Sequence, residues 1–199
     1  MLRPSIRAAS SAALLIACSV ALAAAPQVAP RKAPPRVNAN AAVIQDFLKR
    51  VDGYVGQHKK LEATLPALPK QTTPQQIDTH QRALAILVQE ARKDARPGEL
   101  LTPAMQQRIR ALLRPIFTGL DGQQIKNEIL DNESKSSVKL VVNGRYPDEV
   151  PVSTMPPQVL KTLPKLPGEL EYRFIQNNLI LFDTHGHIIV DFMERAFIE

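Results

Sequence analysis

Three apolar runs near the end of the chain constrain its fold more than any other feature. They lie between Leu170 and Phe192, with the sequences LEYRFI, LILFD and IIVDF, and the short polar segments QNN and THGH separate them. In the first run, Glu171 and Arg173 alternate with apolar residues. Alternation with a period of two, broken by Asn- and Gly-containing turns, is typical of antiparallel strands joined by hairpins. The sequence therefore predicts a C-terminal β-meander.

The chain before this meander has a different periodicity. Between residues 38 and 131, apolar residues recur at spacings of three and four, which is typical of amphipathic helices. His80 lies on one of these apolar stripes, and we expect it to be partly buried with a backbone or helix partner rather than to act as a ligand. Each stripe follows a helix start signal, and these signals are Asn40, Thr73-Pro74, Thr102-Pro103 and Asp121-Gly122.

The segment between the helices and the meander predicts one more strand and one short helix. Val138–Val142 alternates and ends at an Asn143-Gly144 turn. Six prolines between residues 147 and 167 exclude a long helix or a central strand there. A helix of one or two turns can still begin at Pro156 or Pro157.

The order of these elements predicts an α+β fold with a single folded unit. We expect an N-terminal antiparallel bundle of about four helices, a short helix and a small C-terminal antiparallel β-meander. The helical region covers residues 38–131, and the β-rich region covers residues 132–199. Each region alone is small, so we expect the two to pack together as one unit.

Residues 1–23 have the features of a secretory signal peptide. Arg3 and Arg7 precede an apolar run, and Ala21-Leu22-Ala23 is a small-x-small cleavage pattern. The following linker, residues 24–37, is rich in proline and basic residues and is expected to be disordered. The sequence therefore predicts a periplasmic or secreted protein with no transmembrane span after signal removal.

An alternative processing site overlaps the signal peptide. Leu15-Ile16-Ala17-Cys18 resembles the lipobox of bacterial lipoproteins, in which Cys18 would carry the lipid and anchor the protein to a membrane. Apolar residues continue past Cys18, which favours ordinary cleavage. Cys18 is the only cysteine of the chain, so no intrachain disulfide can form.

The charge of the chain excludes nucleic acid as a partner. There are 25 basic and 19 acidic residues, a formal net charge of +6. Five of the basic residues precede Val37, so the remaining chain has 20 basic and 19 acidic residues. Nucleic-acid binding requires a dense basic face that neutralises phosphates, and a balanced domain does not supply one.

The meander also contains a candidate metal site, formed by Asp183, His185, His187 and Asp191. His185-x-His187 places two imidazoles on one side of an extended segment, and Asp183 shares that parity. Two imidazoles and a carboxylate suit zinc or a similar divalent ion with an open position. The same residues also fit a solvated hairpin turn built on Gly186. No other cofactor is expected, because no dinucleotide or phosphate-loop motif is present.

Two functions remain open, with a third if Cys18 is lipidated. The first is a non-enzymatic module that binds an envelope protein, a peptide or a wall component, using Tyr172, Arg173 and Phe182 beside exposed strand edges. The second is a small periplasmic metal-dependent hydrolase that uses the four candidate ligands. The third is an anchored structural lipoprotein.

Several segments resemble a family of exported bacterial proteins of unassigned function. They are GRYP, VSTMPPQVLKTLP, LPGELEYRF, LILFD and IIVDF, and upstream DFLKRVDGYV, TPQQI and EARKDARPGELLTP. The resemblance implies export and a single folded unit over most of the mature chain. It implies no catalytic residue and no cofactor.

The two processing alternatives predict different mature N-termini. Cleavage after Ala23 yields an unmodified chain that begins at Ala24, and we expect intact-mass spectrometry of the exported protein to find it. A mature chain that begins with a lipid-modified Cys18 would contradict this prediction and establish the membrane anchor.

Overall fold

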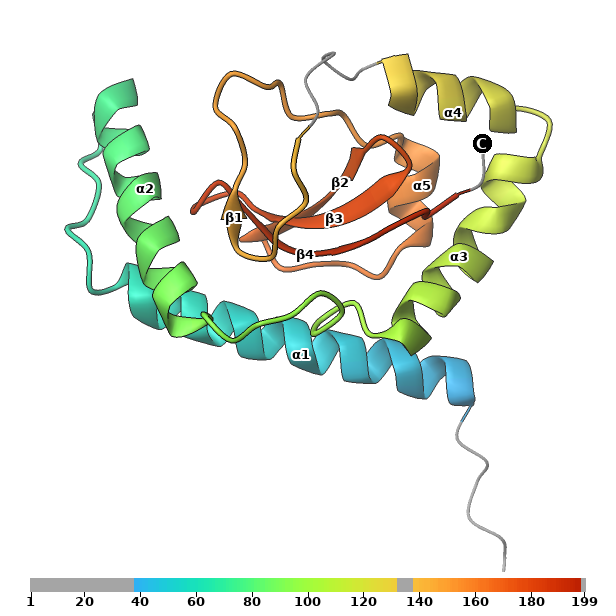
Figure 1. The fold of residues 1–199 in the computed structure, drawn as a ribbon, viewed down its shortest axis with the longest axis horizontal. Helices are drawn as coiled ribbons and strands as arrows, with labels where there is room; N and C mark the ends of the chain where they lie inside the picture. Colours follow the sequence, from blue (N-terminus) through green and yellow to red (C-terminus); the bar gives the residue numbers. More distant parts are fainter. Residues whose placement is uncertain (1–37, 132–137, 198–199) are drawn as a thin grey trace, which may run out of the picture. The chain divides into compact units, whose positions relative to one another are not determined.

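The computed structural model describes residues 38–131 and 138–197, which belong to one compact unit, Val37–Glu199. The predicted signal peptide, the predicted linker and Cys18 lie outside the described residues. In chain order the elements are α1 (Ala39–Glu62), α2 (Pro74–Ala91), α3 (Pro103–Thr118), α4 (Gly122–Asp131), β1 (Gly144–Arg145), α5 (Pro157–Thr162), β2 (Leu170–Ile175), β3 (Asn178–Asp183) and β4 (Ile188–Met193) (Figure 1). The predicted α+β class is confirmed.

The helix start signals act as the sequence predicts, with one shift. Thr73 forms a capping box with Gln76 at the start of α2, and Thr102 accepts a hydrogen bond from the Met105 backbone N–H in α3. The cap of α1 is Asn38, two residues before the predicted Asn40. No helix in the described ranges is long and apolar enough to cross a membrane.

The four strands form an antiparallel sheet in the order β1-β4-β3-β2, which contains the predicted meander as β2-β3-β4. The strand expected over Val138–Val142 is not formed. The backbone N–H of Gly144 instead donates to the Val141 carbonyl at 2.9 Å, and Asn143 has a φ of 57°. The strand that pairs with β4 is therefore β1, which begins at this turn. It forms a two-residue strand at the edge of the sheet.

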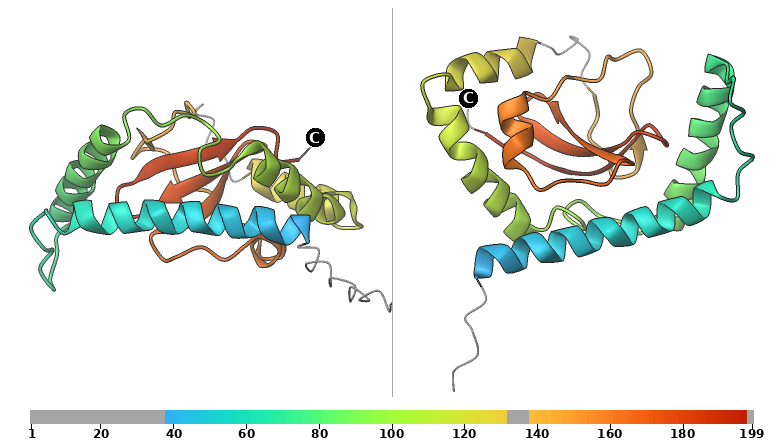
Figure 2. Two further views of the ribbon diagram at one scale, coloured as in Figure 1. Left: turned by 90° about the horizontal axis from the view of Figure 1, so that it is seen from below. Right: turned by 180° about the vertical axis from the view of Figure 1, so that it is seen from behind.

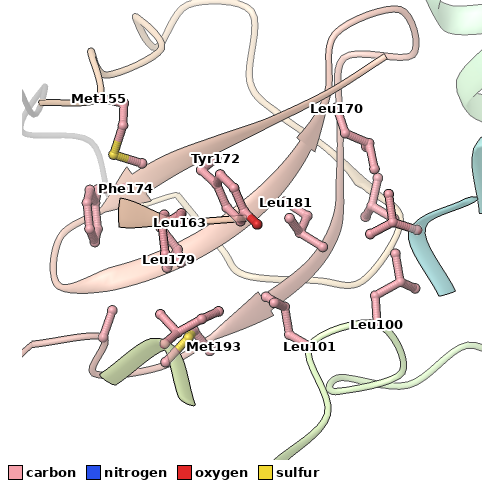
Figure 3. Packing of buried hydrophobic residues seen from close by; sticks show 14 of the residues in the cluster. Leu100, Leu101, Met155, Leu163, Leu170, Tyr172, Phe174, Leu179, Leu181 and Met193 are labelled. Carbon is pink, nitrogen blue, oxygen red and sulfur yellow. The ribbon is translucent and has the colours of Figure 1, made fainter. Parts of the chain in front are cut away.

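Both faces of the sheet are covered. One face of the sheet shares a core with α1 to α5. Figure 3 shows part of this core, in which Tyr172 and Leu181 lie among the apolar side chains of the sheet and of the segments around it. The other face packs under the segment that includes Tyr146 and Val150. α1, α2 and α3 border the sheet in every view (Figure 2). The helices therefore share a common core with the sheet.

A buried carboxylate holds the loop between α2 and α3 against β4. Asp191 is fully buried, and its side chain accepts hydrogen bonds from the backbone N–H groups of Gly98 (2.9 Å), Leu100 (2.8 Å) and Leu101 (2.9 Å). Leu100 and Leu101 are themselves fully buried core residues. Because buried N–H groups need partners, this carboxylate determines the path of the loop.

We expect Asp191→Ala to lower the free energy of unfolding by about 3 kcal/mol, because it leaves several buried N–H groups without an acceptor. Urea unfolding followed by circular dichroism measures the change. Asp52→Ala is the control, since Asp52 is exposed on α1, and its effect should stay within about 0.5 kcal/mol. Equal effects of the two substitutions would contradict the anchoring role.

Candidate metal centre

The carboxylate of Asp183 connects the end of β3 to α1. Asp183 is fully buried, and its Oδ2 accepts hydrogen bonds from the Tyr54 hydroxyl at 2.5 Å and from His58 Nδ1 at 2.6 Å. Its Oδ1 accepts from the backbone N–H groups of His185 (2.9 Å) and Gly186 (2.7 Å). A single side chain thus binds two residues of α1 and the turn between β3 and β4.

These contacts stabilise the charged forms of the buried pair. Burial alone would raise the pKa of Asp183, but hydrogen bonds from His58, Tyr54 and Gly186 outweigh burial and lower it. Burial likewise opposes charge on His58, yet the hydrogen bond and charge of Asp183, with the charge of Glu62, raise its pKa above the usual value. Burial and then the charge of Asp183 raise the pKa of Tyr54, which stays a neutral donor.

The second nitrogen of His58 has no hydrogen-bond partner among the described residues. Its side chain is completely buried, and Nε2 lies 3.3 Å from Oε2 of Glu62, one helical turn later in α1. That distance permits electrostatic attraction, but the alignment is not that of a hydrogen bond. Asp183 therefore orients an imidazole whose second nitrogen faces the carboxylate of Glu62.

Glu62 is surrounded by three imidazoles. Besides His58, its Oε1 lies 2.9 Å from Nδ1 of His185 and 3.5 Å from Nε2 of His80. The side chains of Glu62, His80 and His185 are 28%, 11% and 45% exposed, so this cluster extends from the core to the surface. Burial of Glu62 raises its pKa, but His185, His58 and His80 together lower it below the usual value.

Three of these side chains can reach one ion. His58, Glu62 and His185 each offer a ligand atom, and the three atoms lie within 4.8 Å of one another. Two imidazoles and a carboxylate are a zinc-type ligand set. The Asp183–His58 hydrogen bond has the arrangement found behind metal-bound histidines, in which a carboxylate fixes the tautomer and the ring orientation.

The four ligands predicted from the sequence do not share this site. His185 belongs to it, and Asp183 supports it from behind, whereas Asp191 anchors the loop before α3. His187 packs against the rings of Tyr146 and Phe182, with centroids 5.7 and 5.1 Å away. The parity argument does not apply because His187 has a φ of 52° and is not in an extended segment.

The residues predicted to bind a partner lie elsewhere. Tyr172 and Phe182 are only 2% and 4% exposed and belong to the two hydrophobic cores, so they offer no surface to a partner. Arg173 is partly exposed and pairs with Glu171 on the same strand. The alternation of β2 correctly placed Tyr172 on one face, but helices cover that face.

His58 and Glu62 are functional candidates that the sequence analysis did not select. Their spacing of four residues on α1 places both on one side of a helix, and this is the only local signal. The contact between His58 and Asp183 spans 125 residues, so spacing along the chain does not reveal it. His80 was expected to be partly buried with a backbone or helix partner, and it lies beside Glu62 of helix α1.

Comparison of the chain with protein-family models, with curated proteins and with solved structures found no match. The support for the candidate site is therefore its geometry alone.

Two buried tyrosines test the role of Asp183. Tyr54→Phe removes a hydrogen bond to a buried carboxylate, and we expect it to lower the free energy of unfolding by about 2 kcal/mol. The matched control is Tyr172→Phe, because the Tyr172 hydroxyl is buried among apolar side chains and has no hydrogen-bond partner among the described residues (Figure 3). Denaturant unfolding should find the control neutral or slightly more stable, and similar losses for both variants would contradict the assigned role.

Proposed function

We propose that this protein binds a divalent transition-metal ion of the zinc type through His58, Glu62 and His185. The observation that supports this most is the arrangement of His58. Its Nδ1 is held by Asp183, while its buried Nε2 makes no hydrogen bond within the described residues and lies 3.3 Å from Oε2 of Glu62. An ion between these two side chains would be bound by an imidazole and a carboxylate, and His185 would complete the ligand set.

The ligands are already oriented toward one another before an ion arrives. The ring of His58 is fixed by Asp183, and the turn that carries His185 is fixed by the same carboxylate through the backbone. Ligand groups that are held in place lose little conformational freedom when they bind, so less of the binding energy is spent on ordering them. Glu62 adds the negative charge that favours a cation.

The half-exposed side chain of His185 gives an ion a route to this otherwise buried cluster. In the absence of metal, the raised pKa of His58 makes a proton the competing occupant of Nε2. Glu62 attracts that proton as it would attract a cation. The arrangement therefore suits exchange of an ion with the solvent rather than a permanently enclosed structural centre.

We further propose that the protein acts after export, as a binding module in the periplasm or outside the cell. The charged and apolar segments of residues 1–23 support this location. The resemblance to exported bacterial proteins agrees with it. The alternative function, a metal-dependent hydrolase, also requires a bound ion. It can be tested only once metal binding is established.

The test is isothermal titration of zinc into the mature protein, purified without a histidine tag and stripped of metal. We expect one ion per chain. His185→Gln should weaken binding at least about tenfold, since removing even a supporting group commonly costs that much. His187→Gln is the matched control because it removes an imidazole two residues away that contacts aromatic rings instead, and it should bind as the unsubstituted protein does.

A second variant probes the support of His58. Asp183→Asn keeps the shape of the side chain but removes its charge, and circular dichroism identifies whether the variant still folds. Absence of zinc binding at micromolar concentrations would disprove the proposal. Equal losses in His185→Gln and His187→Gln would show that zinc binds to histidines in general rather than at this site.

A further inference from the structure

A second candidate site lies at the far end of β4, where the chain passes α3. A pocket of about 420 Å³ is lined by residues of α3, α4 and the segment that follows β4. Its basic lining residues come from all three segments and are Arg110, Arg114, Lys126 and Arg195. No Asp or Glu is among its lining residues.

The concentration of charge in this pocket is unusual for the folded unit. From Val37 onward the chain has 20 basic and 19 acidic residues, yet four positive side chains meet here without a carboxylate among the lining residues. None of the four forms an ion pair with another residue in the ranges that the structure describes. Their charges are therefore available to an anion.

One of these cations is held in position by the fold. Arg110 donates hydrogen bonds to the backbone carbonyls of Glu194 (2.7 Å) and Arg195 (3.0 Å), which fixes both the guanidinium and the segment after β4. Arg195 has a φ of 49°, so the chain turns at this residue. Arg114 is exposed and Lys126 is half-buried, and neither side chain forms a hydrogen bond or ion pair within the described ranges.

The remaining wall of the pocket is largely apolar. Phe117 and Phe197 contribute to it, with their ring centroids 4.4 Å apart, and Ala111 and Ala196 lie beside them. Both phenylalanines are nearly buried, so they form a floor rather than a protruding surface. A ligand that matches this pocket has an apolar body and an anionic group that meets the cations.

We propose that this pocket binds a small amphipathic anion, namely an apolar chain or ring that carries a carboxylate. Charge complementarity selects the anionic group, and the phenylalanine floor selects the apolar body. The volume lies within the range of pockets that bind small molecules, whereas stable protein interfaces use larger and flatter surfaces. The proposal is independent of metal binding.

Isothermal titration of dodecanoate, below its micellar concentration, into the mature protein tests the proposal. We expect saturable binding of one dodecanoate per chain. The double variant Arg114→Gln/Lys126→Gln should bind about tenfold more weakly, because it removes two partners of the carboxylate. Neither side chain forms a hydrogen bond or ion pair in the part of the chain that the structure describes, so the variant should unfold at the same temperature as the unsubstituted protein.

The control Lys49→Gln/Lys60→Gln removes the same net charge from exposed positions on α1 and should leave the affinity within about twofold. Dodecanol, which lacks the charge, should bind more weakly than dodecanoate. Lack of saturable binding, equal losses in the two double variants, or equal affinity for dodecanol would each overturn the proposal. So would binding only to anionic phospholipid vesicles, which would assign the basic residues to a membrane surface.

Discussion

The buried carboxylate of Asp183 is the interaction on which the rest of the candidate metal centre depends. Burying an isolated carboxylate is very costly, and the cost falls only when hydrogen bonds and an opposite charge compensate it. Asp183 has four donors, and one of them is the imidazole of His58. Because two donors come from α1 and two from the turn after β3, the requirement to satisfy one charge sets the position of that helix against the hairpin.

The same contacts determine the geometry of the imidazoles. His58 donates directly to Asp183, and His185 follows in the turn whose backbone Asp183 holds. A change at Asp183 should therefore disturb both rings at once. Residues that share one buried network do not contribute additively, so single substitutions within this network should not be summed to estimate its total contribution.

Asp191 performs a comparable structural role one strand away. It accepts hydrogen bonds from the backbone of Gly98, Leu100 and Leu101, where Asp183 accepts from side chains of α1 as well as from the backbone. The sequence placed both aspartates in a candidate metal site because they lie near two histidines. Their partners are far away in the chain. Asp191 anchors the loop between α2 and α3, whereas Asp183 supports the candidate ligand His58.

The sequence predicts those features that depend on contacts between residues close together in the chain. Thr73 and Thr102 start helices through contacts within three residues, and the alternation of β2 reflects neighbouring side chains, so these predictions are confirmed. The predicted turn at Asn143-Gly144 is formed, but the strand expected before it over Val138–Val142 is not. His58 was missed because its contact with Asp183 exists only after α1 packs on the sheet.

The strand β4 separates the two proposed sites. It begins at Ile188, next to the turn that carries His185, and ends at Met193, two residues before Arg195 of the basic pocket. A strand rises about 3.3 Å per residue, so the two ends of β4 lie roughly 17 Å apart, and the sites lie beyond its opposite ends. Screening by salt further weakens any charge effect over that distance. A bound metal ion should therefore leave the affinity for dodecanoate unchanged unless β4 itself moves.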